Sequence, residues 1–377
     1  MKPNDSMIPL VDLASQYAAI KPEIDQAVAR VIQSANFIRG NEAKSFADEF
    51  GRYCHAKAVG VGNGTDALYL AARAIGISPN DEVILPSHTF IATAEAIAET
   101  GAKCVFADID EKTYTIDPKD VEAKITPRTR AIVAVHLYGQ PADMTNLRKV
   151  AKTHGLSLIE DAAQAHGARV EDEVVGTLGH VAAFSFYPGK NLGAYGDAGA
   201  VVSTQDDIIS RVTTLSDHGR TTKYIHDHIG RNSRLDELQA AILRVKLGHL
   251  ESWNRRRQEI AALYSRVLAS PAISIPFVAP GRTHVFHLYV VQVDDRDTVR
   301  RHLETNGVAA GIHYPIPVHL QPAFRHLGYR EGSLPRTEKA AKHILSLPIF
   351  PEMTEAQVSR VTGLIGDSLG VSMGRRS

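Results

Sequence analysis

Cysteine is scarce in this sequence: among 377 residues it occurs only as Cys54 and Cys104. Two cysteines in unrelated contexts exclude a disulfide scaffold and a cysteine-based zinc site, and they fit a reducing cytoplasm. The sequence also lacks any apolar run of about 18 residues, so we expect no membrane-spanning helix. The first residues, MKPNDSMIPLVDL, lack the apolar stretch of a signal peptide. These absences predict a cytoplasmic protein without a membrane partner.

An excess of charge of either sign is absent as well. Lys and Arg number 42, and Asp and Glu number 42, so the formal net charge is zero. Nucleic-acid affinity depends on concentrated positive charge, so we expect no nucleic-acid partner. Apolar residues make up 44% and charged residues 22%, which is ordinary for a folded globular protein. At roughly 150 residues per domain, the length predicts about two domains.

Short apolar runs alternate with periodic helical segments through the middle of the chain. The runs are continuously apolar, which is typical of strands covered on both faces. The predicted strands are Ala58–Val61, Val83–Leu85, Lys103–Phe106, Ala131–Val135, Ser157–Ile159, Ala182–Phe186 and Ala200–Ser203. The predicted helices between them include Asp66–Ile75, Ile91–Glu99 and Met144–His154. This alternation predicts an α/β domain with a mainly parallel sheet.

The pattern changes after about Arg234. The predicted helices there are Leu235–Leu250, Trp253–Leu268, Thr298–Asn306, Thr337–Leu345 and Thr354–Leu369. The predicted strands there are His287–Val293 and Gly307–Tyr314. We therefore expect a large domain over 1–250, with residues 1–15 as an N-terminal arm, and a smaller α+β domain over 251–377.

A glycine-rich turn, VGNGTD at 61–66, lies between a predicted strand and a predicted helix. Glycine lets the backbone approach a ligand, and a helix N-terminus presents unpaired N–H groups to an anion. Thr65 adds a hydroxyl, so the turn is a candidate phosphate cup. The glycine spacing is not the dinucleotide fingerprint, which argues against a nicotinamide-dependent oxidoreductase. The alternative is a tight turn in which Thr65 or Asp66 caps the helix.

Two further residues follow apolar strands. Asp161 ends the strand in LIEDAAQAHG, at the edge where α/β sheets bind ligands, and it could hold a cationic ring nitrogen. The alternative is a helix cap. Lys190 stands in the turn of FSFYPGKNLG, where partial desolvation would favour the neutral, nucleophilic amine. The alternative is a solvated loop lysine.

One cofactor accounts for these three features together. Pyridoxal phosphate needs an anion cup, a lysine amine for the imine, and a carboxylate at its pyridine nitrogen. The carboxylate keeps that nitrogen protonated, so the ring can accept electrons. An aromatic face on the ring is also expected, and Phe90 follows a predicted strand. Phe90 could equally be a core residue.

Several long motifs in the same order identify a resemblance. They are NGTDAL (63–68), NDEVILP (80–86), AVHLYGQPADM (134–144), IEDAAQAHGA (159–168), FSFYPGKNLGAYGDAGA (184–200), GRNSRLDELQAA (230–241) and HYPIPVHLQPAF (313–324). The chain resembles the DegT/DnrJ/EryC1/StrS family of pyridoxal-phosphate sugar aminotransferases. The resemblance implies the fold-type-I, aspartate aminotransferase-like architecture, with a mainly parallel sheet in the large domain and a smaller α+β C-terminal domain.

The resemblance also implies the roles of individual residues. Lys190 is the implied imine lysine, Asp161 the partner of the pyridine nitrogen, and Gln164 a neighbour of the ring's 3-hydroxyl. The implied phosphate ligands are Gly64, Thr65 and Ser185, with Phe90 stacked on the ring. Asn232 would reach the phosphate from a neighbouring subunit, which implies a homodimer with a shared active site.

The resemblance points to one branch of the family. Related dehydratases carry His where this sequence has Lys190, so transamination is favoured. The run DHGRTTKYIHDHIG at 217–230 and the run GIHYPIPVHLQ at 311–321 resemble enzymes that aminate C3 of a 3-keto-6-deoxyhexose on a nucleoside diphosphate, for which we expect dTDP. L-Glutamate is the implied amino donor. The candidate substrate contacts are Arg220, Tyr224, His226, His313, Tyr314 and His319.

Other interpretations stay open at this stage. Tyr314 and His319 could instead pack against the neighbouring prolines. A 4-aminotransferase or an aminotransferase for a UDP-linked 3-keto-uronic acid is the nearest alternative, and a non-catalytic regulator on the same fold is a remote one. His226 and His228 have a spacing that could suit a metal, but zinc needs three or four convergent ligands, so we expect none.

Overall fold

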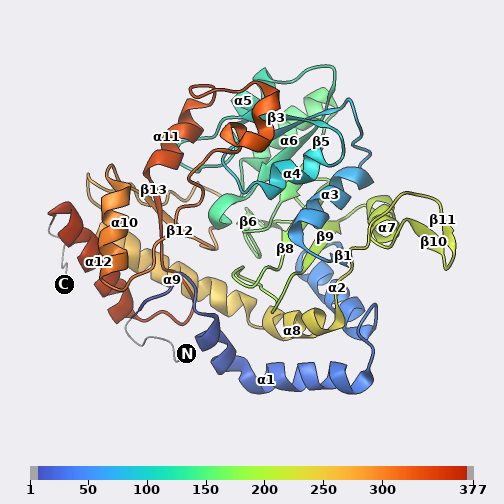
Figure 1. The fold of residues 1–377 in the computed structure, drawn as a ribbon, viewed down its shortest axis with the longest axis horizontal. Coiled ribbons are helices and arrows are strands. Elements are labelled where there is room, and N and C mark those ends of the chain that lie inside the picture. The colour runs from blue at the N-terminus through green and yellow to red at the C-terminus, as the bar shows by residue number, and fades with distance from the viewer. Residues whose placement is uncertain (1–6, 372–377) are drawn as a thin grey trace.

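A seven-stranded sheet forms the centre of the computed structural model, which describes residues 7–371 (Figure 1). Its strand order is β1-β9-β8-β5-β4-β2-β3. The strands are β1 (Lys57–Val61), β2 (Glu82–Pro86), β3 (Lys103–Ala107), β4 (Thr129–Val135), β5 (Ser157–Asp161), β8 (Val181–Ser185) and β9 (Gly199–Ser203). Strand β9 pairs antiparallel with both β1 and β8, whereas the other pairings are parallel. The seven predicted strands and the mainly parallel sheet are therefore confirmed.

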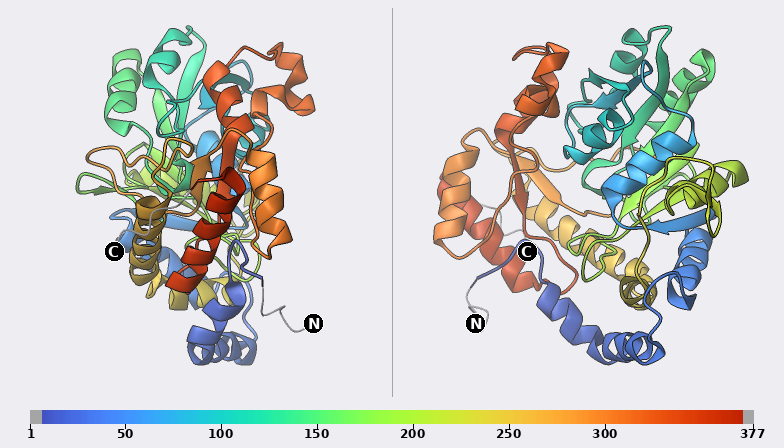
Figure 2. Two further views of the ribbon diagram at one scale, coloured as in Figure 1. Left: turned by 90° about the vertical axis from the view of Figure 1, so that its left-hand side faces the viewer. Right: turned by 45° about the vertical axis from the view of Figure 1, so that its right-hand side comes forward.

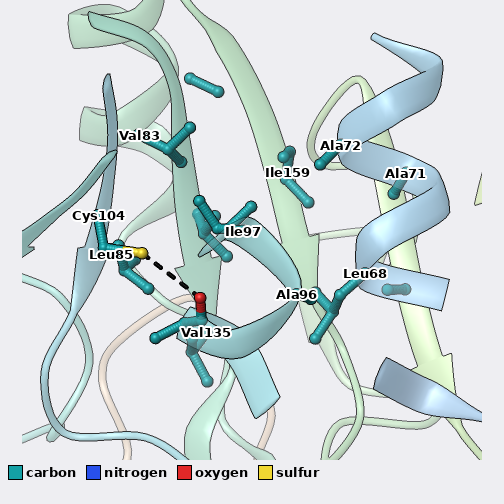
Figure 3. Close-up of a cluster of buried hydrophobic side chains, with 14 of the residues drawn as sticks. Leu68, Ala71, Ala72, Val83, Leu85, Ala96, Ile97, Cys104, Val135 and Ile159 are labelled. Carbon is teal, nitrogen blue, oxygen red and sulfur yellow. Dashed lines mark hydrogen bonds between the residues drawn. The ribbon is translucent and has the colours of Figure 1, made fainter. Parts of the chain in front are cut away.

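Helices cover both faces of this sheet, which explains why its strands are continuously apolar. Along β2, Val83 and Leu85 belong to one buried cluster, which also contains Leu68 of α3 (Figure 3). Ile84, between them, belongs to the other cluster, with Phe50 of α2. The surrounding helices are α2 (Asn41–Tyr53), α3 (Gly64–Ala74), α4 (Ala92–Ala98), α5 (Pro118–Ala123), α6 (Met144–His154), α7 (Asp206–Leu215) and α8 (Glu237–Leu247).

The C-terminal elements gather to one side of the sheet (Figures 1 and 2). They are α9 (Leu250–Leu268), β12 (Tyr289–Gln292), α10 (Arg296–Thr305), η2 (Val318–Leu320), η3 (Pro322–Leu327), α11 (Pro335–His343), β13 (Ile344–Leu347) and α12 (Glu355–Leu369). Strands β12 and β13 pair antiparallel. A separate buried cluster joins α9, α10 and α12 to these strands, and Ile8 is part of it. A second link crosses to the sheet, because Leu288 and Phe324 pack in the same cluster as Leu68.

The division into domains at residue 250 stays a prediction. The separate C-terminal cluster favours it, and α9 begins at Leu250. Of the predicted arm over 1–15, residues 1–6 lie outside the described residues. Ile8 forms an isolated bridge with Val308, and helix α1 already begins at Leu13.

Several predicted elements need correction. The helix predicted over Thr337–Leu345 ends at His343, and Ile344 begins strand β13 because this segment pairs with β12. The strand predicted over Gly307–Tyr314 forms only isolated bridges, among them one between Gly311 and Ser346. Two helices were not anticipated, α1 (Leu13–Ser34) and α2 (Asn41–Tyr53). Helix α1 lies along α8, where Ile20 and Ile24 bury against Ile242.

The remaining short strands form two hairpins, β6 (Arg169–Val170) with β7 (Glu173–Val174) and β10 (Arg220–Thr222) with β11 (Ile225–His226). The short η1 turn (Leu137–Gly139) follows β4. Within residues 7–371, no helix combines the length and apolarity that a bilayer crossing requires.

Candidate active site

A cavity of about 830 Å³ opens at the carboxyl ends of β5 and β8. Parallel strands end at the same edge of a sheet, so side chains far apart in the sequence meet there. Nine of the sequence-predicted site residues line this cavity: Gly64, Thr65, Phe90, Asp161, Gln164, Ser185, Lys190, His313 and Tyr314. The structure therefore brings together the candidates from the large domain and two from the C-terminal region.

Asp161 is the last residue of β5, and its carboxylate is 6% exposed. The Thr93 hydroxyl donates a hydrogen bond to Asp161 Oδ2 at 2.7 Å, and the Ala163 backbone N–H donates to Oδ1 at 3.2 Å. A buried carboxylate held on both oxygens has a fixed direction, so it can meet a cationic partner without reorganising.

Lys190 lies half-buried in the turn that follows β8, where its backbone N–H donates to Tyr187 O at 2.8 Å. Burial lowers the pKa of the Lys190 amine to about 8, while the charge of Asp161 acts in the opposite direction. A pKa near 8 gives a substantial fraction of neutral amine at physiological pH, and only the neutral amine is a nucleophile or a base.

The neighbouring Asn191 ties this turn to the interior. Its amide Nδ2 donates to Asn254 Oδ1 at 2.8 Å and to Val285 O at 2.9 Å. Asn254 Nδ2 in turn donates to His166 O at 2.8 Å. Lys190 thus projects into the cavity from a backbone that buried hydrogen bonds hold in place.

The first turn of α3 meets the end of β8 at close range. The Asn63 side chain caps the helix by accepting from Asp66 N at 2.8 Å, while the N–H groups before Asp66 have no intrahelical partner. A Cβ on Gly64 would lie 2.6 Å from Ser185 Cβ, so only glycine permits this approach. The hydroxyls of Thr65 and Ser185 flank the same place, and together these groups form a cup suited to a phosphate.

Aromatic and amide groups form the opposite wall. The Phe90 ring is 53% exposed, and its centroid lies 5.5 Å from that of Tyr314. Gln164 Nε2 donates to the Tyr314 hydroxyl at 3.3 Å, and Gln164 Oε1 accepts from Tyr138 N at 2.6 Å. Next to Tyr314, burial lowers the pKa of His313 to about 4, so this imidazole is neutral.

Sequence reasoning missed several residues of the cavity wall, among them Thr93 and His287. His287 Nδ1 is buried and has no hydrogen-bond partner among residues 7–371. Burial and the charge of Lys190 hold the pKa of His287 well below its usual range. No sequence motif marks either residue, because only tertiary packing brings them to the cavity.

Five predicted residues lie outside the lining of this cavity, and four of them lie on or just after the β10–β11 hairpin. Arg220, Tyr224 and His226 belong to the β10–β11 hairpin, and Tyr224 is 80% exposed. Arg220 forms an ion pair with the buried Asp217, and His226 Nδ1 lies 2.9 Å from His218 O. Asn232 is exposed beyond the hairpin.

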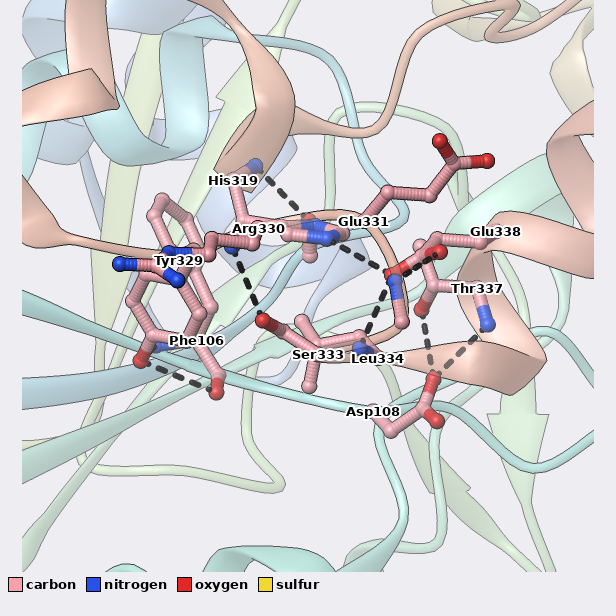
Figure 4. A network of polar contacts seen from close by, with 12 residues as sticks. Phe106, Asp108, His319, Tyr329, Arg330, Glu331, Ser333, Leu334, Thr337 and Glu338 are labelled. Carbon is pink, nitrogen blue, oxygen red and sulfur yellow. Dashed lines mark hydrogen bonds and ion pairs between the residues drawn. The ribbon is translucent and has the colours of Figure 1, made fainter.

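His319 also lies outside the cavity lining, within a buried polar network (Figure 4). Its Nδ1 is 2.6 Å from Ser87 Oγ, and its Nε2 is 3.2 Å from Glu338 Oε1. Both ring nitrogens are thus already paired, and the side chain supports the wall after β2 instead of facing the cavity. Among the described residues, no group of three or more His, Cys, Asp or Glu side chains has an arrangement suited to a metal.

The described groups fit pyridoxal phosphate. Gly64, Thr65 and Ser185 form a cup suited to a phosphate, the Lys190 amine has a lowered pKa, and the oriented Asp161 carboxylate lines the same cavity. Fold and site together define a fold-type-I, pyridoxal-phosphate-dependent aminotransferase. The model of the DegT/DnrJ/EryC1/StrS aminotransferase family matches residues 18–365, and the chain belongs to this family.

Named relatives agree with this assignment. The chain is 50% identical over 356 residues to the dTDP-3-amino-3,4,6-trideoxy-alpha-D-glucose transaminase of Streptomyces venezuelae, covering 94% of each sequence. It is 43% identical to the UDP-N-acetyl-3-dehydro-alpha-D-glucosamine 3-aminotransferase of Acidithiobacillus ferrooxidans, covering 97% of this chain and 99% of that one. The crystal structure of S. venezuelae DesV in complex with a ketimine intermediate superposes with a TM-score of 0.94 at 49% identity, covering 96% of this chain and 98% of that one.

The family and these relatives confirm three predictions made from the sequence. The protein is an enzyme, pyridoxal 5′-phosphate is its cofactor, and it belongs among the aminotransferases of nucleotide sugars.

Proposed function

We propose that this enzyme transfers an amino group to C3 of a 3-keto-6-deoxyhexose linked to a nucleoside diphosphate, with dTDP as the nucleotide and L-glutamate as the amino donor. The 50% identity over nearly the full length to a dTDP-3-amino sugar transaminase supports the regiochemistry and the nucleotide. The observation that carries the reaction type is the shared cavity of Lys190 and Asp161, a desolvated amine beside an oriented carboxylate.

Asp161 and Lys190, which we call the floor of the cavity, each have a proposed task. When bound, pyridoxal phosphate supplies an electron-accepting ring that makes the substrate C–H bond acidic. Asp161 would keep the ring nitrogen protonated through a charge-assisted hydrogen bond. The Lys190 amine would hold the cofactor covalently at rest. Once released, the amine would remove a proton from the substrate carbon of the amino donor in the first half-reaction and, in the second, would deliver a proton to the sugar carbon that receives the amino group.

The remaining cofactor contacts divide between the two ends of the ring. Gly64, Thr65 and Ser185 would hold the phosphate through backbone N–H groups and hydroxyls at the cup. Gln164 would hold the 3-hydroxyl, and Phe90 would cover one face of the ring. His313 and Tyr314, on the opposite wall, are the proposed sugar contacts within the same subunit.

The other proposed contacts involve a second subunit. Asn232 and the hairpin residues Arg220, Tyr224 and His226 lie outside the cavity of their own chain, and Asn232 and Tyr224 are exposed. An exposed hairpin that carries an arginine and a tyrosine suits a diphosphate and a sugar ring in a neighbouring cavity. We therefore propose a homodimer in which Asn232 reaches the partner's phosphate cup and the hairpin covers the partner's substrate.

Two alternatives within the family lead to different products. The identity of 43% to a UDP-N-acetyl-3-dehydroglucosamine aminotransferase favours amination at C3. The second candidate substrate is therefore a UDP-linked 3-keto sugar, including a 3-keto-uronic acid. A 4-keto sugar aminated at C4 is the third.

A substrate screen tests the proposal. Enzyme converted to its amino form with excess L-glutamate would be mixed with a panel of dTDP- and UDP-linked 3-keto and 4-keto sugars, and the products analysed by mass spectrometry. Formation of a 3-amino-6-deoxyhexose on dTDP at the highest kcat/KM supports the proposal. A higher kcat/KM with a UDP-linked uronic acid or a 4-keto sugar would replace the proposal, and no amination of any sugar in the panel would refute it.

A further inference from the structure

Two buried threonine hydroxyls form a chain that ends on Asp161. Thr89 Oγ1 lies 2.7 Å from Thr93 Oγ1, and Thr93 Oγ1 lies 2.7 Å from Asp161 Oδ2. Thr89 is 3% exposed and Thr93 is 1% exposed. Both residues line the same cavity as Asp161, although the sequence separates Thr93 from Asp161 by 68 positions. These hydrogen bonds therefore belong to the site, although the sequence analysis did not predict a role for either threonine.

The chemistry of the groups determines the direction of this chain. An ionised carboxylate only accepts hydrogen bonds, so the single hydroxyl proton of Thr93 goes to Asp161. Thr93 Oγ1 must then accept from Thr89, whose proton completes the chain. Every hydrogen bond runs from Thr89 through Thr93 to the carboxylate, and a donor that is itself hydrogen-bonded is polarised and becomes stronger.

The chain also connects two walls of the cavity. Thr89 directly precedes Phe90, which is proposed to cover one face of the ring, and Thr93 is the second residue of α4. Asp161 Oδ1 is held separately by Ala163 N at 3.2 Å, so each carboxylate oxygen has one donor from the protein. Rotation of the carboxylate would break one of these bonds. The lone pairs that face the cavity therefore keep a fixed direction.

We propose that Thr93 is a positioning residue, which orients the Asp161 carboxylate toward the pyridine nitrogen of the cofactor and is itself oriented by Thr89. This inference rests on the proposed role of Asp161. Removing the Thr93 hydroxyl leaves the carboxylate free to turn and leaves Thr89 without its acceptor. Protonation of the ring nitrogen and retention of the cofactor then both become weaker.

The test compares Thr93→Val, which keeps the shape and removes the hydroxyl, with Thr93→Ser, which restores a hydroxyl. Each protein would be loaded with pyridoxal phosphate carrying ¹⁵N at the ring nitrogen, and its solid-state ¹⁵N spectrum would report protonation. Titration of the apoprotein with pyridoxal phosphate, followed by fluorescence, gives the Kd. We expect Thr93→Val to move the ¹⁵N signal toward the unprotonated position and to raise the Kd about tenfold, the loss typical of one hydrogen bond to a charged group. Thr93→Ser should stay within about threefold of the wild type.

Two more variants separate positioning from general damage. Thr89→Val removes only the outer hydroxyl, so it should move both readouts in the same direction but by less than Thr93→Val. Thr100→Val is the matched control, because Thr100 is also buried, at the end of the same helical segment, and its hydroxyl bonds to Ile97 O at 2.7 Å outside the cavity. This control should lose stability without moving the ¹⁵N signal.

The outcomes distinguish this inference from the proposed function. If Asp161→Asn shifts the ¹⁵N signal and Thr93→Val leaves both the signal and the Kd at wild-type values, the inference is overturned while the role of Asp161 stands. If Asp161→Asn itself leaves the signal unchanged, the proposed role of Asp161 is wrong and the inference is lost with it. Should Thr93→Val fail to fold, a wild-type ¹⁵N signal in Thr89→Val would overturn the inference that the Thr89–Thr93–Asp161 hydrogen bonds orient the carboxylate.

Discussion

The floor of the cavity and the β10–β11 hairpin differ in how firmly their own chain holds them. On the floor, Asp161 has a protein donor on each carboxylate oxygen and Lys190 stands in a turn anchored by Asn191. On the hairpin, Tyr224 is 80% exposed and Ile225 is 57% exposed. The side chains of Asp161 and Asn191 are therefore held by their own chain, whereas the side chains of Tyr224 and Ile225 on the hairpin are exposed.

This difference matches two different tasks. Proton transfer needs groups held within a few tenths of an ångström, which buried strand ends provide. Recognition of a variable sugar needs adaptable groups at a rim, which loops provide. We therefore expect substitutions on the floor to impair both half-reactions and substitutions on the hairpin to affect only the half-reaction with the sugar.

The largest expected effect comes from the floor, at Lys190. Lys190→Ala should still bind pyridoxal phosphate but lose at least about 10⁴-fold in turnover, because the covalent tether and the proton carrier are both removed. Single-turnover rates with L-glutamate and with the keto sugar would measure this loss. Appreciable turnover in Lys190→Ala would refute the assignment of Lys190.

A second buried lysine offers a matched control for this variant. Burial also lowers the pKa of Lys246 to about 8, but its Nζ donates to Gly193 O at 2.8 Å and lies outside the cavity lining. Borohydride should therefore fix the cofactor covalently to the wild type and to Lys246→Met, but not to Lys190→Ala. Covalent fixation in Lys190→Ala would mean that another amine holds the cofactor.

Asp161→Asn should have the next largest effect. The amide keeps the shape but loses the negative charge, so the ring nitrogen is protonated less and both half-reactions slow about 100-fold. Stopped-flow measurement of each half-reaction would show whether they slow together. The control is Asp108→Asn, another buried aspartate, which accepts hydrogen bonds from Thr337 and lies outside the cavity lining; this variant should lose stability and keep rates near those of the wild type. Slowing of only the sugar half-reaction in Asp161→Asn would contradict the comparison of floor and hairpin.

The lowered pKa of Lys190 predicts a pH dependence of apoprotein stability. The unfolded chain binds the Lys190 proton up to about pH 10.5 and the folded chain only up to about pH 8. Between these values the unfolded state holds more protons, so the stability of the wild type rises with pH there. Below pH 8 the folded state carries the full cost of a buried ammonium, and Lys190→Met avoids it.

The expected advantage of Lys190→Met is therefore greatest at pH 7 and smaller by about 1–2 kcal/mol at pH 9.5. Unfolding of both apoproteins by urea at the two pH values would measure it. An advantage that stays constant or grows with pH would mean that Lys190 is solvated in the folded state, and the floor would then be less preorganised than its hydrogen bonds indicate.

The smallest expected effect is on the hairpin. Tyr224→Ala should raise the KM for the nucleotide sugar about fivefold, the loss of one exposed aromatic contact, and leave the half-reaction with L-glutamate unchanged. Ile229→Ala, which replaces another exposed side chain close to the hairpin, should change neither. Equal effects of the two variants on both half-reactions would indicate that the hairpin supports the fold and does not recognise the sugar.

Much of the central sheet could be predicted from the sequence because each strand carries its own signal. A strand buried on both faces is continuously apolar, and Val83, Ile84 and Leu85 illustrate this by packing into two different clusters. Helices α1 and α2 were missed because their apolar residues are spaced among many polar ones and find their partners elsewhere in the chain, those of α1 on α8 and those of α2 against the central sheet. Strand β13 was mistaken for the end of a helix because pairing with β12 decides its conformation.

The site divides in the same way. Gly64, Asp161 and Lys190 could be predicted because each lies at a strand end within a long motif. Thr93 and His287 could not, because their neighbours in the sequence say nothing about the cavity that they line. His319 differs from both groups: a motif made it a candidate substrate contact, and in the structure Ser87 and Glu338 contact its two ring nitrogens.

By itself, the sequence determined the class of fold and the cofactor, because the apolar strands and the motifs that follow them are local features of the sequence. Only the tertiary structure decided that the Lys190 amine is desolvated, that Thr89 and Thr93 hold the Asp161 carboxylate, and that the hairpin lies away from its own cavity. The reason is that burial and hydrogen-bond direction depend on groups brought together from distant parts of the chain. The local sequence at a strand end does not specify which side chains will surround it.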